Sequence, residues 1–230
     1  MSMSPWSAFF YRLCRYVLIG PALWLLGRPE VKGREHLPRR GPYIVAANHL
    51  AVLDSFYLTR ALRRQVFFLA KSDYFDRPGP LGLAQRWFFR GVGQICVDRR
   101  GGDGAAPALT AAIGIIERGG VWGIHPEGTR SPDGRLYRGH TGAVRVAMTT
   151  GVPLLPVAIT GTGPDPGRPW WRRRVTLEIL PPIDLTGYRA AGAHGTRRAT
   201  DALMRTLAAR TGQLYVDEYA RRRPDHELAA

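Results

Sequence analysis

The chain has 230 residues, of which 45% are hydrophobic and 22% are charged. These proportions are typical of a globular protein of one to two domains, and they exclude a disordered chain, a collagen-like rod and a coiled coil. The 33 Lys and Arg residues outnumber the 18 Asp and Glu residues, which leaves a net charge of +15. A surface this basic indicates an anionic partner: nucleic acid, an acidic membrane, a phosphorylated substrate or an acidic carrier protein.

The two cysteines, Cys14 and Cys96, lie far apart in the sequence. A disulfide framework needs more cysteines, so we expect two buried thiols in a reducing compartment. The chain has no cysteine pairs of the kind that bind structural zinc, and we therefore expect no metal site.

The N-terminal stretch from Trp6 to Leu26 is strongly apolar but is interrupted by Arg12 and Arg15. The uninterrupted apolar run 16–27 is shorter than the roughly 20 residues that a spanning helix needs, and Pro21 is expected to break or kink it. The residues that follow form a poor signal-peptide cleavage site. We therefore predict an N-terminal amphipathic membrane-interface segment of one or two short helices, with the arginines meeting anionic headgroups. The residues expected at the acyl boundary are Trp6, Phe9, Phe10, Trp24 and Leu25. The alternative is an ordinary amphipathic helix packed on the core.

The rest of the chain alternates between strand-like and helix-like segments. Strands are expected at 43–47, 66–70, 93–97, 121–124, 152–159 and 175–180. Helices are expected at 53–61, 81–89, 142–149 and 196–209, with another that opens in the glycine-rich stretch 101–104 and runs to about 118. This alternation predicts an α/β fold, a mixed sheet flanked by helices. The predicted organisation is a membrane-associating segment at 1–30, an α/β domain at 31–215 and a C-terminal tail at 216–230.

His49 and Asp54 are the first candidate pair for catalysis. His49 follows a buried strand and Asp54 opens the next helix. On one helix they would lie about 140° apart, but a turn at His49 can fold the carboxylate under the imidazole. A carboxylate bonded to one ring nitrogen fixes the tautomer and leaves the other nitrogen as a base. The alternative is a turn histidine beside a helix-capping aspartate.

Charged residues also follow three other apolar strands. Lys71 follows 66–70, Arg99 follows 93–97, and Glu127 and Arg130 lie in the turn after 121–124. Ligands bind outside the carboxyl ends of strands in open α/β sheets, so we expect the three cationic side chains to converge there on a dianion. The alternative for the last turn is a solvated Glu–Arg pair.

Four segments carry a specific resemblance: NHLAVLD, GQICVDR, HPEGTRS and VPLLPVAI, in this order within residues 48–159. They resemble the four sequence blocks of the glycerophosphate acyltransferase family, and most of all its bacterial 1-acyl-sn-glycerol-3-phosphate acyltransferases. The resemblance implies that His49 deprotonates the sn-2 hydroxyl of the acceptor while Asp54 orients the imidazole. The hydroxyl would attack the thioester of acyl-CoA or acyl-carrier protein directly and give phosphatidate for phospholipid synthesis. It implies no cofactor beyond this co-substrate.

The resemblance also implies which residues bind substrate: Lys71, Arg99, Glu127, Gly128, Thr129 and Arg130. Arg99 would hold the acceptor phosphate, Glu127 and Gly128 would position the acceptor, and Arg130 would support the loop or touch the phosphate. One departure concerns His125, because the family usually has Phe before Pro-Glu-Gly. We expect an imidazole in place of an aromatic wall; a titrating role beside Glu127 is the alternative.

The implied location is the cytoplasmic face of the cell membrane, as a peripheral or monotopic protein. Its expected partners are the anionic membrane surface, a lysophospholipid acceptor and acyl-CoA or acidic acyl-carrier protein, with no nucleic acid. Alternatives are another acceptor, such as glycerol 3-phosphate, or a non-catalytic lipid-binding or nucleic-acid-binding protein with the Arg run 172–174. A metal-dependent hydrolase would use the residues His49, Asp54, His125 and Glu127 as ligands.

Overall fold

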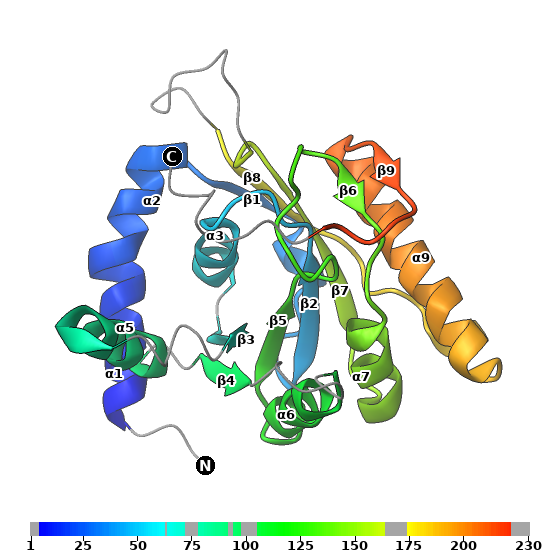
Figure 1. The fold of residues 1–230 in the computed structure, drawn as a ribbon, viewed down its shortest axis with the longest axis horizontal. Helices are drawn as coiled ribbons and strands as arrows, with labels where there is room; N and C mark the ends of the chain where they lie inside the picture. Colours follow the sequence, from blue (N-terminus) through cyan, green and yellow to red (C-terminus); the bar gives the residue numbers. More distant parts are fainter. Residues whose placement is uncertain are drawn as a thin grey trace.

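The structure is a computed structural model that describes residues 5–62, 64–71, 78–91, 94–97, 105–163 and 174–221. Its centre is a seven-stranded sheet in the order β1-β8-β7-β2-β5-β3-β4, with helices on both faces (Figure 1). The strands are β1 Glu30–Lys32, β2 Tyr43–Ala47, β3 Val66–Lys71, β4 Ile95–Val97, β5 Val121–Ile124, β7 Leu154–Thr160 and β8 Thr176–Ile179. Two short strands, β6 Leu136–Tyr137 and β9 Tyr215–Val216, pair separately. The predicted mixed α/β fold is confirmed.

Strand direction decides which residues share an edge of the sheet. β2 runs parallel to both β5 and β7, and β3 runs parallel to both β5 and β4. β8 is antiparallel to β7, and β1 is parallel to β8. The carboxyl ends of five strands therefore lie at one edge, where His49 follows β2, His125 follows β5 and Lys71 ends β3.

The helices cover the two faces of the sheet through two apolar clusters. They are α1 Pro5–Leu13, the π-helical segment η1 Cys14–Leu18, α2 Ile19–Gly27, the short 3₁₀ segment η2 Arg34–His36, α3 Asp54–Ala61, α5 Gly79–Gly91, α6 Ala105–Glu117, α7 Gly142–Thr150, α8 Thr186–Arg189 and α9 Gly192–Thr211. Alternate residues of β2 face opposite sides, as the pleat requires. Tyr43 and Val45 pack in the cluster that includes α3 and Leu23 of α2. Ile44 and Ala46 pack in the cluster with α6, α7 and α9. The two predicted domain boundaries fall inside β1 and β9.

The N-terminal segment is helical from α1 through η1 to α2, so the predicted break at Pro21 is wrong. In η1 the amide of Ile19 donates to the carbonyl of Cys14, five residues earlier. This π turn places Pro21 in the first turn of α2, where a missing N–H is tolerated best. Among the described residues, Phe9–Gly27 is the one helix long and apolar enough, by length and composition, to cross a membrane. This helix is longer than the uninterrupted apolar run 16–27 because it includes Arg12 and Arg15.

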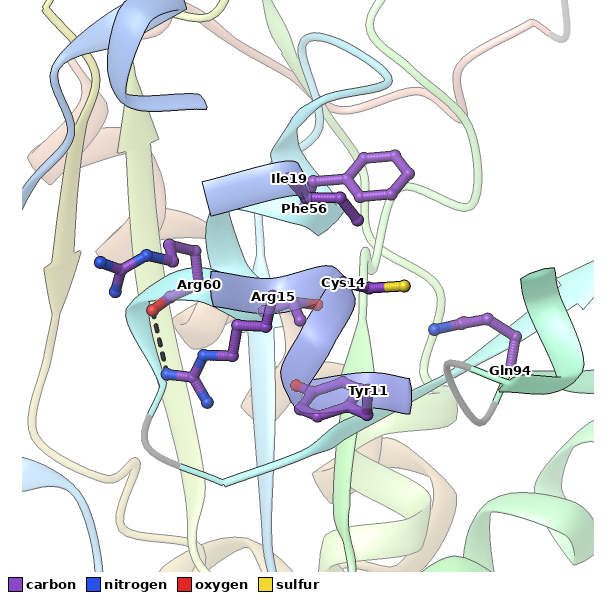
Figure 2. A pocket seen from close by; sticks show the side chains of 8 residues that line it. Tyr11, Cys14, Arg15, Ile19, Phe56, Arg60 and Gln94 are labelled. Carbon is purple, nitrogen blue, oxygen red and sulfur yellow. Dashed lines mark hydrogen bonds between the residues drawn. The ribbon is translucent and has the colours of Figure 1, made fainter. Parts of the chain in front are cut away.

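Arg15 attaches this N-terminal helix to the α/β domain. The side chain of Arg15 is buried, and its guanidinium donates to the carbonyls of Arg60, at 3.1 Å, and Leu62 (Figure 2). These two carbonyls lie at the C-terminal end of α3, where helix carbonyls lack intrahelical partners and favour a cation. The prediction that Arg15 meets lipid headgroups is therefore wrong, whereas Arg12 is exposed.

A shallow pocket lies beside this attachment point. It is lined by Tyr11, Cys14, Arg15, Ile19, Phe56, Thr59, Arg60 and Gln94 (Figure 2). Cys14 is a buried free thiol, as expected, while the side chain of Cys96 lies outside the described part of the chain.

Large apolar side chains remain exposed on the other side of the N-terminal helix and on α5, which contacts α1. They include Phe9, Tyr16, Val17, Trp24 and Leu25 on the N-terminal helix and Leu81, Leu83 and Trp87 on α5. Phe10 instead packs against Tyr11 and Cys14, which corrects its expected place at the acyl boundary. The side chain of Trp6 lies outside the described part of the chain.

Candidate active site

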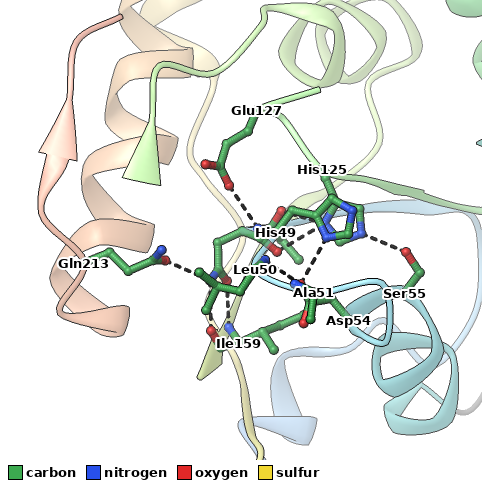
Figure 3. A network of polar contacts seen from close by, with 11 residues as sticks. His49, Leu50, Ala51, Asp54, Ser55, His125, Glu127, Ile159 and Gln213 are labelled. Carbon is green, nitrogen blue, oxygen red and sulfur yellow. Dashed lines mark hydrogen bonds and ion pairs between the residues drawn. The ribbon is translucent and has the colours of Figure 1, made fainter. Parts of the chain in front are cut away.

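The turn after β2 brings His49 and Asp54 together. Oδ2 of Asp54, the first residue of α3, lies 3.0 Å from Nδ1 of His49 (Figure 3). The same oxygen accepts the amides of Leu50 at 2.6 Å and Ala51 at 2.7 Å. Asp54 is fully buried; burial opposes its ionisation, but the hydrogen bonds from His49 and Ala51 outweigh burial and lower its pKa. An ionised Asp54 makes Nδ1 of His49 the protonated nitrogen and leaves Nε2 with a free lone pair.

Asn48, just before His49, fixes the end of β2. Its Oδ1 accepts the amide of Ile159 at 2.8 Å. Its Nδ2 donates to the carbonyl of Ile159 and to Oε1 of Gln213, each at 2.8 Å. Sequence reasoning assigned no role to Asn48 or Gln213. The signal in the sequence is an amide side chain directly after the apolar run 43–47; the structure shows it fully buried and paired, as buried amides usually are.

The side chain of Glu127 supports the backbone at His49. Oε1 accepts the amide of His49 at 2.9 Å, and Oε2 accepts the amide of Tyr137 at 3.0 Å. The residue is only 1% exposed. Burial raises the pKa of Glu127 to about 7, although both amide hydrogen bonds favour the ionised form. In this geometry both carboxylate oxygens bind backbone amides, and the role of Glu127 in positioning the acceptor stays a prediction.

The rest of the loop also joins His49. The amide of Ser131 donates to the carbonyl of His49 at 2.8 Å, so this loop holds both backbone groups of His49. Gly128 has a φ of +74° and is exposed. A Cβ there would lie 3.0 Å from the ring of His140, so both backbone conformation and space favour glycine. Thr129 and Arg130 are partly exposed beside Gly128.

The structure describes, in different degrees of detail, the three cationic residues predicted to bind an anion. Lys71 pairs with Val97, the last residue of β4, so these strand ends lie side by side at the edge near His49. The side chain of Lys71 and the whole of Arg99 lie outside the described part of the chain. Arg130 lies within the loop that holds His49, and no described residue forms an ion pair with it.

His125 lies directly against His49. The two imidazole rings are stacked, with centroids 3.9 Å apart and planes at 9° (Figure 3). Nδ1 of His125 lies 3.0 Å from the carbonyl oxygen of Ala47 and 3.1 Å from that of Asn48. Nε2 lies 3.0 Å from Oγ of Ser55. Burial, and then the charge of His49, lower the pKa of His125 to about 3, so this ring is neutral.

The stacked arrangement does not suit the metal-site alternative. Ring nitrogens coordinate in the plane of the ring, so parallel stacked imidazoles do not direct their lone pairs at one point. In the ranges that the structure describes, no group of three or more His, Cys, Asp and Glu residues is arranged to hold a metal ion.

Known proteins show the same combination of fold and sequence. A family profile described as "Acyltransferase" matches residues 28–160. A 1-acyl-sn-glycerol-3-phosphate acyltransferase of Limnanthes alba is 30% identical over 197 residues, which cover 78% of this chain and 64% of that protein. A protein of the same name from Borreliella burgdorferi is 31% identical over 142 residues, covering 61% of this chain and 55% of that protein. The chain thus spans less than two thirds of the length of these relatives.

A solved structure is also similar. The crystal structure of the 1-acyl-sn-glycerophosphate acyltransferase PlsC from Thermotoga maritima matches with a TM-score of 0.62 and 27% identity, covering 88% of this chain and 86% of that one. The family profile spans more than half of the chain and includes both the turn of His49 and the loop of Glu127. The chain therefore belongs to the acyltransferase family.

Proposed function

We propose that this protein transfers a fatty acyl group from acyl-CoA or acyl-carrier protein to the sn-2 hydroxyl of 1-acylglycerol 3-phosphate, giving phosphatidate. The observation that carries the proposal is the His49–Asp54 pair, whose buried carboxylate holds Nδ1; among the residues that the structure describes, no hydrogen-bond partner occupies Nε2. The names of the similar proteins support the same acceptor.

The reaction needs one base and no covalent enzyme intermediate. Nε2 of His49 takes the hydroxyl proton as the acceptor oxygen attacks the thioester carbonyl carbon. Asp54 remains ionised and stabilises the imidazolium that forms. When the tetrahedral intermediate collapses, the carbon–sulfur bond breaks and the leaving sulfur takes the proton from Nε2. The products are the ester and a free thiol, and His49 is again neutral.

The acceptor phosphate would bind at the edge of the sheet where the parallel strands end. Lys71 ends β3, Arg99 follows the neighbouring strand β4 in the sequence, and Arg130 lies within the loop that holds His49. Guanidinium groups bind phosphate bidentately, so two arginines and a lysine suit a dianion. Gly128 and Thr129 would form the part of the phosphate site nearest His49, and the buried Glu127 would support that part of the loop.

We also propose that the protein lies on the cytoplasmic face of the membrane as a monotopic protein. One side of the N-terminal helix is packed on the domain through Arg15, Leu23 and Gly27, so lipid cannot surround the helix. Its other side exposes Trp24 and Leu25, and the chain carries +15. A one-sided apolar helix on a basic protein suits the headgroup boundary of an anionic bilayer.

An assay with purified protein tests the reaction. Lysophosphatidate, glycerol 3-phosphate and a neutral lysolipid are each offered with acyl-CoA and with acyl-carrier protein, and the products are identified by mass spectrometry. We expect transfer to lysophosphatidate and a loss of about 10²–10⁴-fold in kcat for His49→Ala. His194→Ala, a change at an exposed histidine of α9, should retain full activity. Transfer only to another acceptor would overturn the proposed substrate, and an unaffected His49→Ala variant would overturn the proposed base.

Binding measurements distinguish the proposed membrane association from nucleic-acid binding. We expect salt-sensitive binding to vesicles that contain anionic lipid and no comparable binding to RNA of equal charge. Tighter binding to RNA than to vesicles would contradict the proposed location.

A further inference from the structure

We propose that His125, fixed by Ser55 and by two carbonyls at the end of β2, is a positioning residue that holds the imidazole plane of His49. This inference rests on the proposed function, since it assigns His49 the role of base. The position of His125 is one where the family resemblance leads us to expect phenylalanine.

Two consecutive residues of α3 each hold one of the two stacked rings. Asp54 accepts from Nδ1 of His49 at 3.0 Å, and Ser55 lies 3.0 Å from Nε2 of His125 (Figure 3). The rings themselves are 3.9 Å apart and nearly parallel. The start of α3 therefore fixes both members of the stack at once.

The surroundings of His125 determine its tautomer. Nδ1 faces the carbonyl oxygens of Ala47 and Asn48, which only accept hydrogen bonds, so Nδ1 carries the proton. Nε2 then has a lone pair, and the hydroxyl of Ser55 donates to it. Both ring nitrogens are thus used, and the ring cannot rotate without breaking a buried hydrogen bond.

A third ring lies close to the stack. The ring of Phe68 in β3 lies 5.8 Å from that of His125, at 14°. His125 therefore has an aromatic neighbour on the adjacent strand β3 in addition to the ring of His49.

This arrangement supplies an orientation that His49 lacks by itself. Within the described ranges, the ring of His49 has one side-chain hydrogen bond, to Asp54, and a single bond of this kind allows the ring to tilt about the Nδ1–Oδ2 axis. A fixed ring against one face limits that tilt, so Nε2 keeps its direction toward the acceptor. A neutral neighbour also accommodates the imidazolium that forms during transfer, whereas a second cation at 3.9 Å would repel it.

The Ser55–His125 contact has a competing chemical interpretation, in which Ser55 is a nucleophile and His125 its base. Such a pair would carry the acyl group on Ser55 before transfer. The buried, neutral state of His125 makes it a weak base, which favours the positioning role. A covalent acyl group on Ser55 is therefore an outcome that would overturn the proposal.

Steady-state kinetics of three variants test the role. We expect His125→Ala to lower kcat by about 10–100-fold with little change in the KM of the acceptor, because a tilted base misplaces Nε2 by a fraction of an ångström. His125→Phe keeps a stacked ring and should recover most of that loss, and Ser55→Ala should lower kcat several-fold at most. His194→Ala is the matched control. An unchanged kcat for His125→Ala, or no recovery by His125→Phe in a folded protein, would overturn the proposal.

Two further measurements separate failure of this inference from failure of the proposed reaction. The ring ¹⁵N shifts of His125 should show the Nδ1–H tautomer from pH 5 to 8, and should change in Ser55→Ala; this readout needs no turnover. A different tautomer would overturn the inference even if acyl transfer is found. Acid-quenched turnover analysed by mass spectrometry should show no acyl group on Ser55. Absence of transfer with every acceptor would instead overturn the proposed function.

Discussion

Asp54 holds the ring of His49 through a single oxygen, Oδ2, which lies 3.0 Å from Nδ1 and also accepts two backbone amides of the intervening turn. An amide in place of this carboxylate can still offer one oxygen to these donors, but it lacks the negative charge that stabilises the imidazolium. We expect Asp54→Asn to lower kcat by about 10²–10⁴-fold in the acyl-transfer assay. Asp184→Asn, an exposed change remote from the site, is the control. Comparable activity of both variants would contradict the role of Asp54.

Glu127 links stability to pH. Its pKa is raised by burial to about 7, above its ordinary value of 4.5, so the folded chain holds a proton that the unfolded chain releases in this range. The free energy of unfolding should therefore fall as pH rises from about 4.5 to 7. The Glu127→Gln variant has no titrating group at this position. Relative to that variant, the free energy of unfolding of the wild type should fall by on the order of 1–3 kcal/mol between about pH 4.5 and pH 7.

Urea denaturation at several pH values measures this difference. Glu117→Gln, at an exposed position near the end of α6, should run parallel to the wild type. If the wild type and Glu127→Gln have the same pH dependence, Glu127 has an ordinary pKa in the folded protein.

Variants of Arg15 and Arg12 should distinguish two roles of the N-terminal helix: its attachment to the domain and its attraction to the membrane. Arg15→Met leaves the carbonyls of Arg60 and Leu62 without their donor, and we expect unfolding to become easier by about 1–3 kcal/mol. Arg12→Met should leave stability unchanged and weaken binding to anionic vesicles by up to about 1 kcal/mol. Equal denaturation midpoints for the two variants would contradict the structural role of Arg15.

The exposed aromatic residues should contribute to membrane binding. Trp24 and Trp87 are 58% and 72% exposed and lie on α2 and α5. Replacing each by Ala should weaken vesicle binding by about tenfold, since each removes apolar area that would enter the headgroup boundary. Leu214→Ala changes a residue that is 68% exposed near the C-terminus and should have no effect. Unchanged binding of the Trp24→Ala, Trp87→Ala double variant would place the membrane-facing surface elsewhere.

The strands of the sheet centre could be predicted from the sequence because buried parallel strands read as continuous apolar runs. The expected bounds of β2 and β5 agree with the structure residue for residue. The polar residues that follow them lie at one edge because the strands are parallel, which the alternation with helices already implied. The two- and three-residue strands β1, β6 and β9 have no such pattern, and the sequence did not predict them.

The contacts that refine the site depend on tertiary pairing and could not be predicted. Glu127 meets the amide of His49 from 78 residues away, and Ser55 meets His125 from 70 residues away. The spacing of residues along the sequence does not predict contacts between residues so far apart. The pairing of His49 with Asp54 is different, because the two residues are five positions apart and a single turn connects them.

Helix α3 is only eight residues long, and its two ends make different contacts. One end receives the guanidinium of Arg15, and the other presents the carboxylate and hydroxyl that align the two imidazoles. A helix of this length is about 12 Å of stiff rod, so a displacement at one end reaches the other nearly undiminished. A change in how the N-terminal helix packs on α3 would therefore also reach the two imidazoles at the opposite end of that helix.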